Sequence, residues 1–209
     1  MGSISRFNLS KIAADYNCLN FVETGTWKGD AVAFALQTNF VRIISIEIIP
    51  GIAEEAQKRF QHNKNVRIME GNSVSVLFKE LPLLEGNCIF WLDAHFPGAE
   101  EGIRRYDAET NEDRRLPLEK EIEIIRTSRP YFEDILIIDD LRIYEDGPYE
   151  NGNAPADTLP KGHRSIDFVF NHFAATHHIS RLYRDEGYII LTPIHSRSTG
   201  QSNPEQYLT

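Results

Sequence analysis

Acidic residues end four of the five runs that the sequence predicts to be parallel strands. They are Glu23, Glu47, Asp93 and the pair Asp139 and Asp140. Because the carboxyl ends of parallel strands meet at one edge of a sheet, we expect these side chains to gather there. Grouped carboxylates repel one another unless a cation lies between them. The pattern therefore predicts a site for a metal ion or a positively charged ligand.

The first of these acids leads into a turn that contains two glycines. Residues 21–30 read FVETGTWKGD, with Gly25 and Gly29 four positions apart and a helix predicted after them. Glycine lets the backbone approach a ligand closely, and a helix N-terminus offers N–H groups without intrahelical partners. The turn is typical of the first strand–turn–helix unit of a nucleotide-like cofactor site. Glu47 ends the second strand, where an acid binds ribose hydroxyls; a surface glutamate is the alternative.

Two more groups of polar residues follow later strands. Asn72 and Ser73 follow the third strand and could contact an adenine edge or simply cap the next helix. Asp93, Asp139 and Asp140 offer the oxygen ligands that Mg²⁺ and similar hard cations prefer. The alternative is that Asp139 or Asp140 caps the loop that follows it.

Alternating strand and helix patterns position these residues. Strands are predicted at 19–23, 41–47, 66–69, 88–93 and 134–140, with helices after them that begin near 31, 50, 73, 118 and 165. A short helix over 9–16 precedes them, and 179–183 with 188–192 form a closing hairpin. We expect one α/β domain over 1–209 with its core at 19–193, a Rossmann-like doubly wound sheet. Its seven strands are mostly parallel, with an antiparallel C-terminal hairpin and a loose polar tail over 194–209.

Two loops are long for such a sheet. Residues 97–115 are rich in charge, and residues 141–163 are rich in Gly, Pro and Asn. Both follow strand ends on the ligand-binding side, which favours lids or substrate walls. For 97–115, a solvated charged insertion is an equal alternative.

Composition and net charge limit the partners and the compartment that we expect for this protein. The chain has 209 residues and a net charge of −9, which argues against a nucleic acid or an anionic membrane. Cys18 and Cys88 lie in apolar runs, and two cysteines build no disulfide framework, which favours a reducing compartment. No segment resembles a signal peptide or a membrane span, so we expect a cytoplasmic protein. The oligomeric state stays open, with a homodimer as one candidate.

Five segments together resemble the class I S-adenosylmethionine (SAM)-dependent methyltransferases. They are 22–29 (VETGTWKG), 46–50 (IEIIP), 71–73 (GNS), 92–93 (LD) and 138–140 (IDD). The order and spacing are most similar to the metal-dependent O-methyltransferases of the catechol and macrolide-sugar types. Small bacterial methyltransferases with a segment like 90–95 (FWLDAH) are also similar.

The resemblance implies a role for each matching residue. Glu23 and the turn of Gly25, Thr26, Trp27 and Gly29 would hold the methionine end of SAM. Glu47 would bind the ribose, Ile48 would pack on the adenine, and Ser73 would lie at its rim. Asn72 is assigned to the cofactor as well. Asp93, Asp139 and Asp140 match the metal ligands, and Asp93 is also assigned to the cofactor and to catalysis.

One position departs from the catechol enzymes. They carry a lysine base three residues after the first metal-ligand aspartate, where this chain has Phe96. His95 is the nearest titratable group and has a suitable ordinary pKa for a base, although it could equally only pack or ligate near the site. The acceptor implied is then a hydroxyl of a sugar, polyol or natural product rather than a catechol.

Two other functions compete with O-methyl transfer. An NAD(P)-dependent oxidoreductase also has a glycine turn and a ribose-binding acid, but this turn lacks the G-x-G-x-x-G spacing, and Glu23 would repel a diphosphate. A non-catalytic SAM-binding protein would use the two long loops for protein contacts.

Overall fold

The computed structural model describes residues 2–99, 102–103, 105–194 and 204–209. Seven strands form one sheet in the order β3-β2-β1-β4-β5-β7-β6. The strands are β1 (Cys18–Thr24), β2 (Arg42–Glu47), β3 (Val66–Glu70), β4 (Asn87–Leu92), β5 (Ile135–Ile138), β6 (His177–Leu182) and β7 (Tyr188–Pro193). The first five run parallel, whereas β7 is antiparallel to both β5 and β6. The predicted Rossmann-like sheet with a C-terminal hairpin is confirmed.

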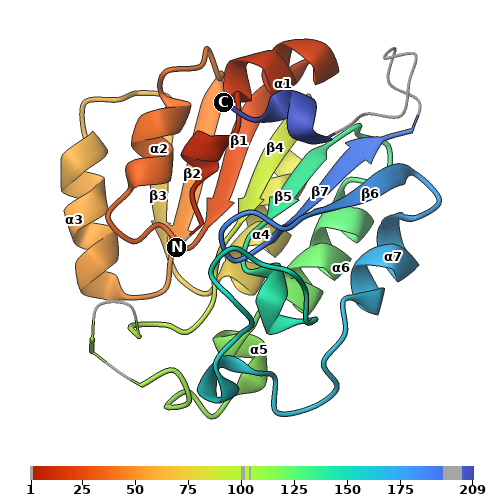
Figure 1. Ribbon diagram of the computed structural model, residues 1–209. Helices are drawn as coiled ribbons and strands as arrows, with labels where there is room; N and C mark the ends of the chain where they lie inside the picture. The colour runs from red at the N-terminus through yellow and green to blue at the C-terminus, as the bar shows by residue number, and fades with distance from the viewer. Residues whose placement is uncertain (1, 100–101, 104, 195–203) are drawn as a thin grey trace.

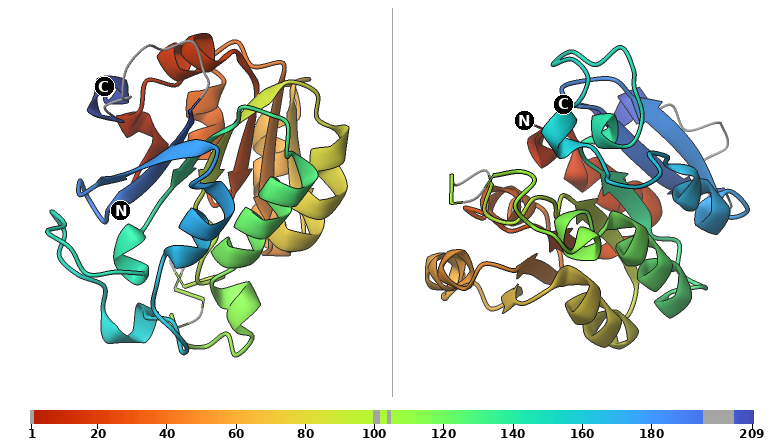
Figure 2. Two further views of the ribbon diagram at one scale, coloured as in Figure 1. Left: turned by 90° about the vertical axis from the view of Figure 1, so that its right-hand side faces the viewer. Right: turned by 90° about the horizontal axis from the view of Figure 1, so that it is seen from below.

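Helices cover both faces of this sheet (Figure 1). They are α1 (Leu9–Tyr16), α2 (Asp30–Ala35), α3 (Pro50–Phe60), α4 (Ser73–Glu80), α5 (Glu112–Arg115), α6 (Leu118–Ser128) and α7 (Asp167–Phe173). The first three pack on one face, and α4, α6 and α7 pack on the other. The layers are seen edge-on in Figure 2, left.

Alternation along the central strands builds two apolar cores. In β4, Phe90 packs toward α4 and α6, while its neighbour Ile89 packs toward α1 and α2. Successive side chains of a strand point to opposite faces, and both faces here are covered. This explains why the parallel strands are continuous apolar runs up to their terminal acids.

The carboxyl ends of the parallel strands face one edge of the molecule, seen from below in Figure 2, right. The short helix α5 and the two long loops cross this edge. Glu23 pairs in register with Ser45 of β2 on one side and with Trp91 of β4 on the other. The acids at the strand ends are therefore brought together as the sequence predicts.

One local prediction, the loose C-terminal tail, was wrong in part. The tail was expected to be loose, but residues 204–209 contain a short 3₁₀ turn, and Leu208 pairs with Phe7. Tyr207 is buried and stacks obliquely on Tyr16, because the tail covers apolar surface that α1 leaves open. Residues 195–203 of that predicted tail lie outside the described residues. In the part of the chain that is described, no helix combines the length and apolar character that a bilayer span requires.

Candidate active site

A cavity of about 550 Å³ lies along the carboxyl edge of the sheet. Its volume is within the range of small-molecule sites in proteins. The predicted residues that line it are Glu23, Gly25, Thr26, Trp27, Glu47, Ile48, Asn72, Ser73, Asp93 and His95. One continuous cavity therefore joins most of the predicted cofactor residues to the predicted catalytic residues.

The glycines of the first turn are needed for close packing. Gly25 has φ +86°, and a Cβ there would lie 2.6 Å from the carbonyl oxygen of Asp93. Gly29 has φ +79°, and its Cβ would meet the ring of Phe60 at 2.6 Å. Positive φ values favour glycine, and neither position has room for a methyl group. Gly25 thus lets the turn lie against the segment after β4, whereas Gly29 packs on α3, and its cofactor contact stays a prediction.

Glu47 ties the end of β2 to this turn. Its Oε2 accepts the backbone N–H of Trp27 at 3.0 Å, and its Oε1 accepts the N–H of Ile49 at 2.8 Å. Trp27 is held at φ +44° by this arrangement. Glu47 lines the cavity, and its contact with a ribose stays a prediction.

Glu23 is a buried acid beneath the turn. Its side chain accepts a hydrogen bond from Ser45 Oγ, which in turn contacts Thr26 Oγ1. Burial raises the pKa of Glu23 well above its usual value, and the nearby charge of Asp93 raises it further, although the Ser45 hydrogen bond lowers it. A cation beside Glu23 would favour the ionised carboxylate. The predicted contact of Glu23 with an ammonium group stays a prediction.

The start of α4 forms the next wall. The Asn72 side chain caps the helix by accepting the N–H of Ser75 at 3.3 Å. The predicted capping role is thus present, and the predicted contacts of Asn72 and Ser73 with adenine stay predictions. Both residues line the cavity together with Ile48.

His95 lies between two acids at the other end of the cavity. Its Nε2 is 2.9 Å from Asp140 Oδ2, and its Nδ1 is 3.4 Å from Asp93 Oδ1. The Arg142 guanidinium lies 3.3 Å from the second oxygen of Asp140. Burial alone raises the pKa of Asp140, but the charges of His95 and Arg142 outweigh it and lower that pKa below its usual value. Asp140 is therefore an ionised partner that can orient the imidazole.

Asp93, His95 and Asp140 form a group whose donor atoms all lie within 4.8 Å of one another. The sequence predicted Asp93, Asp139 and Asp140 as ligands, so two of the three meet as expected and His95 joins them. The carboxylate of Asp139 instead accepts the backbone N–H of Asp140 at 2.8 Å and packs against Gly2. Burial, with the charges of Asp93 and Asp140, raises the pKa of Asp139 well above its usual value. Its role as a ligand stays a prediction.

Three features of the site were missed from the sequence. Residues 2–5 line the cavity, held there by the Ser3 N–H donating to the Tyr188 hydroxyl at 3.1 Å. Glu121 of α6 is buried under the site, and burial raises its pKa to about 7. Phe96 adopts φ +46° beside His95. The acid in the apolar stripe of α6 could have indicated the second feature; the other two depend on tertiary contacts.

Comparison with known proteins gives structural matches. No family model matches the sequence, and no curated protein matches it either. The S-adenosylhomocysteine (SAH)-bound methyltransferase PaMTH1 of Podospora anserina is 14% identical with a TM-score of 0.56; the match covers 88% of this chain and 76% of that one. For the O-methyltransferase of Bacillus cereus in complex with SAH the identity is 16%, the coverage 92% and 82%, and the TM-score 0.58.

A third solved structure, the methyltransferase domain of bacterial CtHen1, is 9% identical with a TM-score of 0.51, and the match covers 89% of this chain and 95% of that one. At these identities the matches establish the fold. The chain therefore has the fold of the class I SAM-dependent methyltransferases, as its motifs predicted.

Proposed function

We propose that this protein is a SAM-dependent methyltransferase that methylates a hydroxyl group of a small molecule. The observation that carries this proposal is the cavity that joins Glu23, Gly25 and Glu47 to Asp93 and His95. Its first end offers two carboxylates, to which an ammonium and a ribose would bind, and its second end holds a histidine between two acids. Two of the similar folds were solved with SAH, which is what remains of SAM after methyl transfer.

The cofactor would lie along the ends of β1, β2 and β3. Glu23 would bind the ammonium of the methionine moiety, with the turn of Thr26 and Trp27 beside it. Glu47 would accept hydrogen bonds from the ribose, and Ile48 would pack on the adenine. In this arrangement the sulfonium methyl group would point toward Asp93 and the acceptor half of the cavity.

His95 is proposed as the general base. With Nε2–H donating to Asp140, the neutral ring presents Nδ1 as its basic nitrogen. The acceptor hydroxyl oxygen would attack the methyl carbon as the bond from that carbon to sulfur breaks, and the hydroxyl proton would pass to His95 Nδ1. Asp140, ionised and fixed by Arg142, would stabilise the resulting imidazolium.

A divalent cation is a second candidate for the same place. Asp93, His95 and Asp140 would hold it, and their donor atoms are close enough to share one ion. A bound cation would lower the pKa of the acceptor hydroxyl and fix its orientation. Mg²⁺ was the ion predicted from the acids, but the imidazole nitrogen suits Mn²⁺ or another transition ion at least as well. As a base and as a ligand, His95 would use the same lone pair, so the two roles compete.

The acceptor class and the partners belong to the same proposal. A sugar, a polyol or a natural-product hydroxyl is proposed as the acceptor, with neither a nucleic acid nor a membrane as partner, and a homodimer as one candidate assembly. Cys18 and Cys88 are buried free thiols, which supports a reducing compartment such as the cytoplasm.

Transfer of a radiolabelled methyl group from SAM to a panel of sugars, polyols and phenols tests the proposal. The assay is run after chelation and then with added Mg²⁺ or Mn²⁺. We expect transfer to at least one acceptor; activity that survives chelation supports the general base, and activity restored only by an ion supports the cation.

Binding measurements separate the competing functions. NADH binding without SAM binding would replace the proposal with an oxidoreductase. SAM binding without transfer to any acceptor would favour the non-catalytic alternative.

A further inference from the structure

Arg115 ends α5, and its side chain is only 1% exposed. Buried arginines need partners for their donors, and Arg115 finds them in both long loops. Its Nε donates to the carbonyl of Tyr106 at 3.0 Å. Its Nη1 and Nη2 donate to the carbonyls of Leu159 and Asp157 at 3.0 and 2.8 Å. One guanidinium therefore joins loop 97–115 to loop 141–163.

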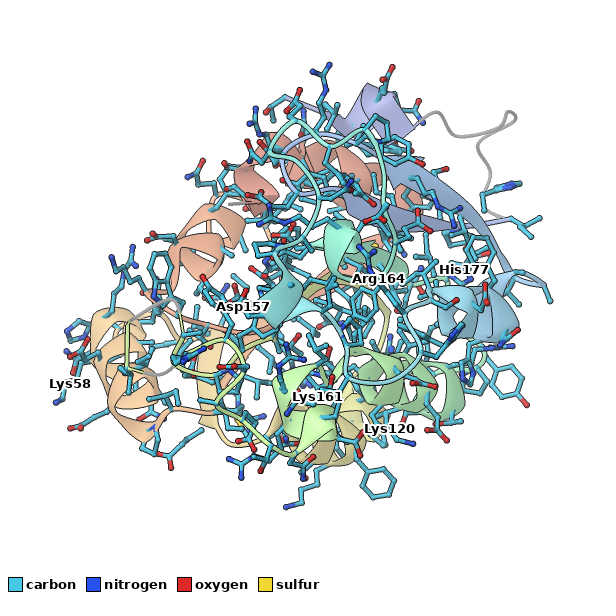
Figure 3. All side chains as sticks on the ribbon, turned by 60° about the horizontal axis from the view of Figure 1, so that its bottom comes forward. Lys58, Lys120, Asp157, Lys161, Arg164 and His177 are labelled. Carbon is cyan, nitrogen blue, oxygen red and sulfur yellow. The ribbon has the colours of Figure 1, made fainter. Side chains whose placement is uncertain are left out.

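Glu112 completes this junction from the first turn of α5. Its Oε1 lies 3.0 Å from Arg115 Nη1 and also accepts the backbone N–H of Lys161 at 3.0 Å. Figure 3 labels Asp157 and Lys161 on the second loop, with Lys161 beside α5. The two predicted substrate walls thus form one connected unit.

The same arginine holds Phe96. The Phe96 N–H donates to the Arg115 carbonyl at 2.9 Å, and the guanidinium carbon lies 5.0 Å from the centre of the Phe96 ring. Phe96 precedes Pro97 and has φ +46°, a conformation that costs free energy for any residue other than glycine. Such strain persists only where surrounding contacts impose it, and Arg115 supplies two of those contacts.

Phe96 in turn contacts His95. The two rings meet edge to face, with centres 5.0 Å apart and an interplanar angle of 84°. His95 reaches Asp140 at 2.9 Å from this position. A chain of direct contacts thus runs from the junction of the loops to the imidazole.

We propose that Arg115 is a positioning residue for His95. By fixing the backbone of Phe96, it keeps the imidazole facing Asp140, and with the same guanidinium it holds the two loops together. The catalytic meaning of this inference rests on the proposed function, but the positioning itself can be tested without turnover.

A matched control distinguishes positioning from general stability. Arg129 is also buried, pairs with Asp134 at 2.7 Å and donates to the carbonyls of Leu84 and Gly86. It lies at the amino ends of β4 and β5, on the edge opposite the site. Arg129→Lys should weaken the fold by losing a guanidinium fork, as Arg115→Lys does, without changing the surroundings of His95.

The test compares Arg115→Lys, Arg129→Lys and the unchanged protein in two assays that need no acceptor. The first is the aromatic NMR signal of His95, assigned with His95→Asn and sensitive to the ring current of Phe96. The second is the rate of limited proteolysis within loop 141–163. We expect Arg115→Lys to shift the His95 signal and to speed cleavage of the loop. Under conditions in which both variants are folded, Arg129→Lys should change neither the signal nor the rate of cleavage.

Phe96→Leu separates the two parts of the proposal. It should shift the His95 signal while leaving the rate of loop cleavage unchanged. If an acceptor is known, Arg115→Lys should lower kcat by ~10–100-fold with an unchanged affinity for SAH, the effect of a misplaced catalytic group. An unmoved His95 signal in Arg115→Lys, or equal shifts in both lysine variants, would overturn the inference. Failure to methylate any acceptor would count against the proposed function and leave both assays valid.

Discussion

The two halves of the candidate site are built differently. At the ends of β1 and β2, the cofactor half is formed by backbone turns that Gly25 and Glu47 fix through packing and backbone hydrogen bonds. At the ends of β4 and β5, the acceptor half is formed by side chains, with His95 held between Asp93 and Asp140. Long loops follow the strands of the second half, whereas regular helices follow each strand in the first.

Because of this difference, we expect substitutions in one half to affect mainly stability and substitutions in the other to affect mainly turnover. Changes in the cofactor half should disturb the fold and the cofactor affinity together, because the same backbone provides both. Substitution of His95 should lower turnover while the fold and the cofactor affinity remain, because the backbone of the sheet does not depend on this side chain.

The largest expected effect is on turnover in the acceptor half. His95→Ala should lower the rate of methyl transfer by ~10²–10⁴-fold, the usual contribution of a general base. The affinity for SAH, measured by calorimetry, should not change. His62→Ala, at an exposed histidine, is the control and should keep full activity. Equal turnover in the two variants would remove His95 from the mechanism.

The next effect is on stability in the cofactor half. Gly25→Ala should lower the free energy of unfolding by about 3 kcal/mol, because it combines a positive φ with a clash against the Asp93 carbonyl. Gly51→Ala is the matched control, since Gly51 lies in α3 with no atom within 4 Å of its Cβ position, and it should be neutral or slightly stabilising. Urea unfolding measures both. A Gly25→Ala protein as stable as the unchanged protein would show that the turn tolerates a side chain.

A smaller, pH-dependent effect is expected at Glu121, which lies beneath both halves. Burial raises the pKa of Glu121 from 4.5 to about 7. Between these two pH values the folded protein therefore keeps a proton on Glu121 that the unfolded chain has released. Its contribution to stability is therefore complete below pH 4.5, falls as the pH rises to about 7, and is then constant. A pKa shift of this size corresponds to at most roughly 3 kcal/mol.

Glu121→Gln should remove this dependence. The variant should gain stability relative to the unchanged protein between pH 5 and pH 8 in urea unfolding, and exposed Glu123→Gln should not. Parallel pH profiles for Glu121→Gln and the unchanged protein would contradict the raised pKa of Glu121.

The cofactor half could largely be predicted from the sequence. Strand runs, terminal acids and the glycine spacing are local patterns, and the parallel sheet then brings them together by its geometry. Even there, the glycines have a different role from the predicted close approach to a ligand. Gly25 and Gly29 make room for Asp93 and Phe60, partners that are distant in the sequence.

The acceptor half could be predicted only in part. Asp93, His95 and Asp140 were identified, but their grouping depends on Asp140 at φ +54° turning toward His95 while Asp139 turns away. No local pattern encodes that turn. The wall formed by residues 2–5 and the junction at Arg115 also depend on contacts between segments far apart in the chain.

The most direct test of the central claim is calorimetric titration of the protein with SAH, compared with Glu47→Gln. We expect one binding site in the unchanged protein and an affinity that is ~10–100-fold weaker in the variant, the cost of losing hydrogen bonds to a charged group. Absence of SAH binding to the unchanged, folded protein would contradict the proposal that this cavity holds a methyl donor.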